Sequence, residues 1–84
     1  MKESEELTPV DRIDICACLM SFHHQPEGID RSNPKKLFFW FQLNDETRKI
    51  INEYLSGDLF INAQDYVYAL DNVKRIIHNQ NLVI

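Results

Sequence analysis

The pattern of apolar positions is densest at residues 35–43, which hold four of the nine aromatic residues of the chain. Aromatic side chains suit a pleated strand, in which successive side chains point to opposite faces. One row then contains Leu37, Phe39, Phe41 and Leu43, and the other contains Phe38, Trp40 and Gln42. The longer row predicts the core side of a strand. The other row predicts an apolar outer face that something else must cover.

Residues 13–22 contain only two polar side chains, Asp14 and Ser21. At 100° per residue these two lie together on a helix, which leaves a broad apolar remainder. This pattern predicts a central helix that is contacted on more than one side. We expect the helix to begin at Thr8-Pro9 or at Asp11, because Thr and Asp cap helices and Pro is tolerated in a first turn.

The segments around the aromatic strand predict a β-hairpin followed by two further helices. Residues 28–31 form a short strand, and residues 32–34 favour a reversal of the chain. Asn44 caps the next helix, Gly57 suits its C-terminal end, and Asn62 caps the last helix. The apolar stripes of these two helices are Ile50, Ile51, Tyr54 and Leu55 in the first, and Tyr66, Leu70, Val73 and Ile77 in the second.

The predicted order is therefore α-β-β-α-α, an α+β fold with helices packed on one face of a β-hairpin. Three glutamates among the first six residues predict a disordered acidic tail over residues 1–7, and residues 8–84 form a single α+β domain. A two-stranded sheet is only marginally stable alone. The outer face around Phe38 and Trp40, together with the hairpin edges, therefore predicts a second copy or another partner. We expect the apolar residues 82–84 to join a sheet edge.

The net charge, the length of the apolar runs and the cysteine content argue against several classes of protein. The formal net charge of −4 argues against a general binder of polyanions. No apolar run approaches the ~20 residues that cross a bilayer, and the acidic start is unlike a signal peptide. Two cysteines form no disulfide framework. We expect a cytoplasmic protein that does not contact a membrane.

Zinc is suggested only by Cys16, Cys18, His23 and His24. The two cysteines lie about 200° apart on a helix, so both cannot ligate one ion. Cys16 and His23 share a face, but two ligands are too few. Buried thiols and solvated histidines explain the pattern better. We therefore expect no metal and no other cofactor.

The sequence also contains few residues spaced as a catalytic site would need. Cys18 with His23 or His24 would lie on one terminal turn, without a glycine-rich oxyanion loop. No phosphate-binding loop or dinucleotide fingerprint is present. Glu27 and Asp30 are more typical of surface charges on a hairpin than of an acid–base pair. We expect no enzyme and no catalytic residue.

The hairpin carries the candidate binding residues: Arg31, Lys35 and Lys36 around the turn, with Phe38 and Trp40 on the outer face. Positive charge beside stacking aromatics suits single-stranded nucleic acid. In the other interpretation, Lys35 and Lys36 only keep the end of the sheet soluble, and the aromatic residues belong to the core or to a dimer interface. The negative net charge favours this second interpretation. The sequence predicts a non-enzymatic protein-interaction module that forms a homodimer and acts as an adaptor or inhibitor of a larger partner. A nucleic-acid-binding accessory protein is the alternative.

Four hydrophobic spacings follow one another along the chain. They are residues 13–19 (IDICACL), 37–41 (LFFWF), 54–57 (YLSG) and 66–70 (YVYAL), the last with 73–74 and 76–77. The chain in these segments resembles a family of small uncharacterised domains from phages and from bacterial and archaeal genomes, labelled only as domains of unknown function. The resemblance covers about residues 11–78. It implies an α/β miniature domain of phage or mobile-element origin and carries over no known active residues.

Overall fold

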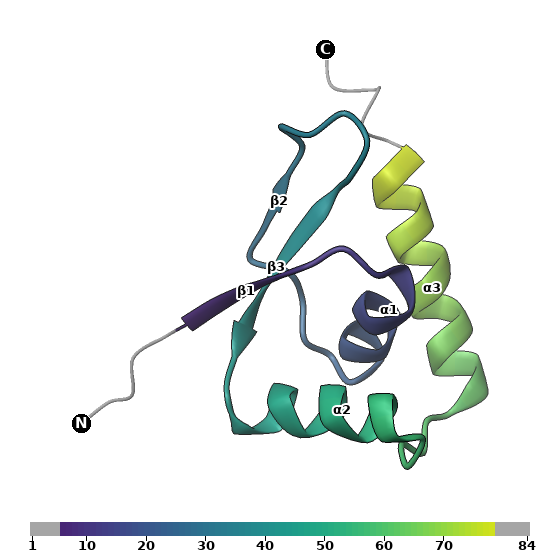
Figure 1. The fold of residues 1–84 in the computed structure, drawn as a ribbon. Coiled ribbons are helices and arrows are strands. Elements are labelled where there is room, and N and C mark those ends of the chain that lie inside the picture. The colour runs from purple at the N-terminus through teal and green to yellow at the C-terminus, as the bar shows by residue number, and fades with distance from the viewer. Residues whose placement is uncertain (1–5, 79–84) are drawn as a thin grey trace.

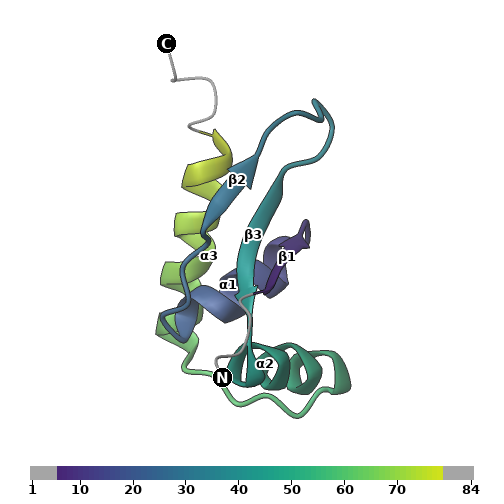
Figure 2. The ribbon, with the colours of Figure 1, turned by 90° about the vertical axis from the view of Figure 1, so that its left-hand side faces the viewer.

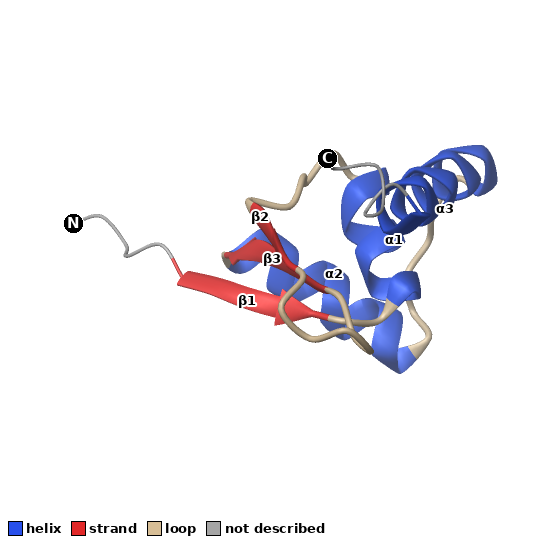
Figure 3. Ribbon diagram, turned by 90° about the horizontal axis from the view of Figure 1, so that it is seen from above, coloured by secondary structure: helices blue, strands red, loops and turns tan. Residues whose placement is uncertain are grey.

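In the computed structural model, which describes residues 6–78, a three-stranded antiparallel sheet lies beside three helices (Figure 1). The elements are β1 (Glu6–Val10), α1 (Ile13–Ser21), β2 (Gly28–Asp30), β3 (Phe38–Leu43), α2 (Asp45–Ser56) and α3 (Ala63–His78). β3 is the central strand, in the order β1-β3-β2. α1 lies between the sheet and α3 (Figures 1 and 3). None of the helices within residues 6–78 is both long and apolar enough to span a bilayer.

The expected α+β class is confirmed, but the expected α-β-β-α-α order lacks the first strand. The order is β-α-β-β-α-α, so the sheet has three strands rather than the two of a hairpin. α1 begins at Ile13, and the expected helix start at Thr8-Pro9 lies inside β1. Proline is tolerated there because an edge strand does not need every backbone N–H. Val10 is buried opposite Phe39, and this packing favours the strand.

β1 also changes the expected N-terminal boundary. The strand starts at Glu6, so it overlaps the acidic tail expected over residues 1–7. The Glu6 carboxylate lies 3.2 Å from Nη2 of Arg48 in α2, which gives this end of the strand a partner. The sequence also predicted that residues 82–84 join a sheet edge, but these residues lie outside the described part of the chain.

α1 occupies the centre of the core. Residues 15–20 are all buried, and Cys16, Ala17 and Leu19 have no exposed surface. A helix that is buried at six successive positions must be covered on every side. α1 packs against β1, α2 and α3, as the sequence predicts for a central helix.

β3 turns alternate side chains toward this core. Phe39 and Phe41 are 2% and 1% exposed, whereas Phe38, Trp40 and Gln42 are only partly buried. The alternation places the first pair on the inner face of the sheet and the other three on the outer face. The predicted placement of Phe39 and Phe41 toward the core is therefore confirmed, whereas Leu37 and Leu43 of the same predicted row are only partly buried.

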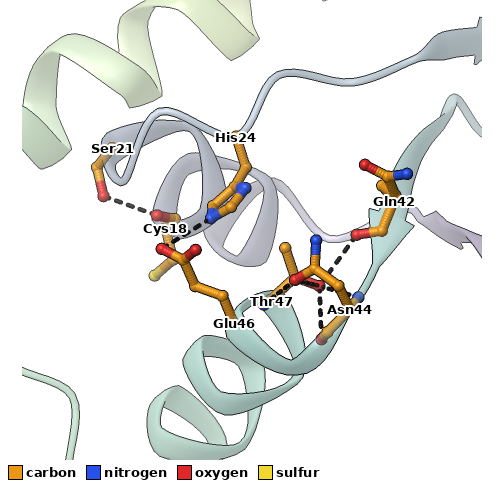
Figure 4. A network of polar contacts seen from close by, with 7 residues as sticks. All are labelled: Cys18, Ser21, His24, Gln42, Asn44, Glu46 and Thr47. Carbon is orange, nitrogen blue, oxygen red and sulfur yellow. Dashed lines mark hydrogen bonds and ion pairs between the residues drawn. The ribbon is translucent and has the colours of Figure 1, made fainter. Parts of the chain in front are cut away.

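Side-chain caps fix the starts of α2 and α3 at the predicted residues. Asn44 Oδ1 accepts a hydrogen bond from the Thr47 N–H at 2.9 Å, and Thr47 Oγ1 accepts one from the Asn44 N–H at 2.8 Å. The Thr47 hydroxyl also donates to the Gln42 carbonyl at 3.0 Å, so it ties the end of β3 to α2 (Figure 4). Asn62 caps α3 with its side-chain oxygen. Gly57 ends α2 with φ +83°, a conformation that favours glycine.

The end of α1 is a Schellman motif built on a non-glycine residue. His23 has φ +71°. The His24 N–H donates to the Leu19 carbonyl at 3.0 Å, and the His23 N–H donates to the Met20 carbonyl at 3.0 Å. A side chain in this left-handed conformation costs roughly 1–2 kcal/mol.

We predict that His23→Gly raises the free energy of unfolding by about 0.5–1 kcal/mol, because the relief of strain exceeds the added entropy of the unfolded chain. Urea denaturation measures the change. Gln25→Gly, two residues further along the loop, is the control and should not stabilise the protein. A loss of stability in His23→Gly would contradict the role assigned to this backbone conformation.

Phe39→Ala tests the core side of the sheet. Removal of a fully buried aromatic ring leaves a cavity and is expected to cost about 3–5 kcal/mol of folding stability. Phe38→Ala, the neighbour on the outer face, is the matched control and should cost clearly less. Urea unfolding of both variants gives the comparison. If Phe38→Ala proves the more damaging, the two faces have been assigned the wrong way round.

Candidate functional site

The side of the sheet that faces away from α1 carries a partly exposed apolar surface, which we call the outer sheet face. Its residues on the three paired strands are Leu7, Pro9, Gly28, Asp30, Phe38, Trp40 and Gln42. α1 and α3 lie on the other side of the sheet (Figures 1 and 2). The outer sheet face therefore places two partly buried aromatic residues, Phe38 and Trp40, on the side of the sheet away from these two helices.

Trp40 lies at the centre of the outer sheet face. Its cross-strand partners are Pro9 in β1 and Gly28 in β2. Gly28 contributes no side chain to this cross-strand pair. Trp40 and Phe38 are half-buried, and Leu7 is 49% exposed. A partly exposed indole with apolar neighbours is the composition found at the centre of protein interfaces.

The predicted basic residues lie in the turn between β2 and β3, which its own polar side chains hold together. Asp30 Oδ1 accepts hydrogen bonds from the Ser32 N–H at 2.9 Å and from the Ser32 hydroxyl at 2.7 Å. Asn33 Oδ1 accepts one from the Lys35 N–H at 2.8 Å. These local bonds are typical of Asx turns and give the loop a defined shape.

The structure separates the predicted basic residues from the centre of the aromatic face. Arg31, Lys35 and Lys36 are exposed at the turn, at the end of the sheet, whereas Trp40 lies further along β3. Nζ of Lys36 is 3.3 Å from the carboxylate of Asp11, which offsets part of the positive charge. The five predicted binding residues thus share one hairpin but form a charged end and an aromatic middle.

A polar cluster that the sequence did not reveal joins the start of α1 to α2. Nη2 and Nε of Arg12 donate to the two carboxylate oxygens of Asp14 at 2.7 and 3.2 Å. The hydroxyl of Tyr54 donates to Asp14 Oδ2. From the sequence, Asp14 was expected on the narrow polar side of an otherwise apolar helix, and Tyr54 in the apolar stripe of another helix. That spacing holds no sign of their contact.

The pKa values of Asp14 and Tyr54 indicate that their contact is structural rather than catalytic. Partial burial raises the pKa of Asp14, but hydrogen bonds from Arg12 and Tyr54 outweigh it and hold the pKa below its usual value. The same hydrogen bond raises the pKa of Tyr54 to about 12. The carboxylate stays ionised and the phenol stays protonated at neutral pH. Neither group is therefore matched to proton transfer there.

The two cysteines have the properties of buried hydrophobic residues. Burial raises the pKa of Cys16 to about 12 and that of Cys18 to about 11, so both thiols stay protonated at neutral pH. The Ser21 hydroxyl donates a hydrogen bond to the Cys18 carbonyl oxygen at 2.7 Å, so this bond does not involve the Cys18 sulfur (Figure 4). Within residues 6–78, no three His, Cys, Asp or Glu side chains are grouped to hold a metal ion.

His24, on the loop after α1, approaches the first turn of α2. Its Nε2 lies 3.2 Å from the carboxylate of Glu46 (Figure 4). The distance suits an ion pair, yet Nε2 is shielded from solvent and the geometry is not that of a hydrogen bond. Since Glu46 is largely exposed, the contact positions the loop rather than forming a buried reactive site.

The fold and its outer face define a small α+β domain with a one-sided, three-stranded sheet. Residues 9–79 match the family described as "Domain of unknown function (DUF5659)", and the chain belongs to that family. No curated protein and no solved structure matches the chain. The resemblance to a family of unknown function is thus confirmed. The match begins inside β1 and includes only its last two residues, Pro9 and Val10.

Tyr54→Phe removes the hydroxyl that donates to Asp14 and should lower the free energy of unfolding by about 1 kcal/mol at pH 7. The native pKa of Asp14 is depressed. Its contribution is therefore present above the unfolded pKa of about 3.9 and is lost as the pH falls through the lower native pKa. The cost of the mutation should shrink in acid.

Urea unfolding at pH 7 and at about pH 3 checks this prediction. Tyr68→Phe, at an exposed position on α3, is the matched control and should change stability little at either pH. A cost for Tyr54→Phe that is the same at both values would show that the hydroxyl does not act through the carboxylate.

Proposed function

We propose that this protein is a non-enzymatic protein-interaction module that self-associates through the outer sheet face. The observation that carries the proposal is the half-buried Trp40 at the centre of that face, with Phe38 and Leu7 beside it. Burial of apolar surface stabilises a complex by roughly 25 cal/mol per Å² before the costs of association. Tryptophan is also enriched among the residues that dominate interface energies.

The edges of the sheet favour contact through the face rather than through added strands. β1 is an edge strand that contains Pro9, which has no N–H to donate, and β2 is only three residues long. Proline and short edge strands both hinder pairing with another chain. A two-fold contact between outer sheet faces would instead place Trp40 of one copy near Trp40 of the other.

In this proposal the self-associated protein serves as an adaptor or inhibitor of a larger partner, in a phage or mobile-element setting. The net charge of −4 supports a basic partner, since opposite charge speeds encounter and disfavours wrong partners. Free, protonated Cys16 and Cys18 suit the reducing cytoplasm.

A nucleic-acid-binding accessory protein is the second candidate, because Arg31, Lys35 and Lys36 are exposed at the end of the hairpin that also carries Phe38 and Trp40. The pairing of Lys36 with Asp11 and the acidic net charge weaken it. Binding of a single-stranded oligonucleotide would fall steeply with salt, whereas an apolar protein interface responds much less. Salt titration therefore separates the two functions.

We predict that the protein is a dimer at micromolar concentration and that Trp40→Ala weakens its association by about 2 kcal/mol, close to 30-fold. The monomer fold should persist, because the indole lies outside the core. Light scattering against concentration gives the mass, and circular dichroism reports the fold. Leu55→Ala, at an exposed apolar residue of α2, is the control and should leave the dimer intact.

Two results would contradict the proposed interface. One is a wild-type mass of 10.0 kDa across a wide range of concentration. The other is unfolding of the domain by Trp40→Ala, which would make the indole a core residue.

A further inference from the structure

The N-terminal part of β1 is held to the fold by few buried side chains. Only Val10, at the C-terminal end of the strand, is buried. Thr8 is half-buried, and the other three residues of the strand are exposed. β1 is also an edge strand, so its backbone pairs with β3 alone. Residues 6–9 therefore depend mainly on backbone pairing with a single neighbouring strand.

A hollow of about 210 Å³ separates part of β1 from the helices. Its lining includes Thr8 and Val10 of β1, Ile15 near the start of α1 and Ile51 of α2. Side chains that border a hollow lose the dispersion contacts that they would make in a filled core. Packing against the helices therefore adds less to the attachment of β1 than a filled core would.

An ion pair lies at each end of β1. The Glu6 carboxylate lies 3.2 Å from Nη2 of Arg48 in α2, and the Asp11 carboxylate lies 3.3 Å from Nζ of Lys36. All four side chains are exposed, so each pair is weak and is screened by salt. The C-terminal end is also anchored by the burial of Val10. The N-terminal end therefore depends more strongly on its ion pair.

We infer that residues 6–9 form a strap, which opens from the edge of β3 while the rest of the domain stays folded. Val10 is the anchored end of the strap, and the ion pair of Glu6 with Arg48 favours the closed state. Opening exposes the backbone edge of β3 from Phe41 to Leu43, the residues that pair with the strap. Such local opening requires less free energy than global unfolding, because it exposes little buried apolar surface.

The strap also contributes Leu7 and Pro9 to the outer sheet face. One consequence rests on the proposed function: a dimer formed through that face would hold the strap closed, because opening removes two residues from the contact. The opening of the strap in a single chain does not depend on the dimer.

Amide hydrogen exchange of the full chain, followed by NMR spectroscopy, tests the strap. We expect the amides that pair β1 with β3 to exchange at least about 100-fold faster than the buried amides of residues 15–20 in α1. Low concentrations of urea should accelerate exchange in α1 much more than in β1, because only global unfolding exposes a large surface. Equal exchange rates, or an equal response to urea, would show that β1 opens only with the whole domain.

Variants of Arg48 test the ion pair. Arg48→Gln should speed exchange in β1 about 2- to 5-fold at low salt, the effect of losing one exposed pair. Added salt should speed exchange in the wild type and have a smaller effect in this variant. The double variant Glu6→Arg, Arg48→Glu reverses the pair and should restore slow exchange.

Lys49→Gln is the matched control, because it removes the same charge from the next position of α2, which is also exposed. It should leave exchange in β1 unchanged. Unaltered exchange in Arg48→Gln, or an equal acceleration in Lys49→Gln, would refute the role of the ion pair.

Trp40→Ala separates the strap from the proposed dimer. If the dimer forms, exchange in β1 slows as the protein concentration rises. Trp40→Ala then removes this dependence on concentration and keeps the acceleration caused by Arg48→Gln. A wild-type monomer whose β1 amides exchange fast, and faster still in Arg48→Gln, would refute the dimer and support the strap.

Discussion

The burial of α1 on every side is the constraint on which the rest of the structure depends. A nine-residue helix with six successive buried positions cannot be covered by one layer, so the sheet, α2 and α3 each contribute a side. Phe39 and Phe41 of β3 belong to the same core as this helix, together with apolar residues of α2 and α3. A chain of this size has little apolar surface left over. The aromatic residues on the other side of the sheet, Phe38 and Trp40, therefore have no layer of the described fold to cover them.

Local signals were enough to predict most elements, and the strand β1 was missed where a local signal had two meanings. The caps Asn44 and Asn62 and the left-handed Gly57 depend only on residues close in sequence, and they hold where predicted. Thr8-Pro9 suits both a helix start and an edge strand. The choice between them depends on pairing with β3, more than thirty residues away, where Thr8 lies opposite Phe41. No local pattern contains that information.

The difference between local signals and contacts between distant residues also applies to the candidate sites. The faces of β3 follow from alternation alone, so Trp40 could be placed on the outer sheet face from the sequence. The contact of Asp14 with Tyr54 joins residues 40 positions apart and needed the structure. The exposed side of α3 has no such signal. The predicted apolar stripe contains Tyr66, Leu70 and Val73, whereas Val67 and Tyr68 are exposed although both are apolar for a solvated side.

In the proposed self-association, contact through the outer sheet face depends on buried apolar area and responds weakly to salt. Phe39 and Phe41 point to the other side of β3, into the core that contains α1. The inner row of β3 would therefore keep its packing in that contact, because the two rows of one strand serve separate surfaces.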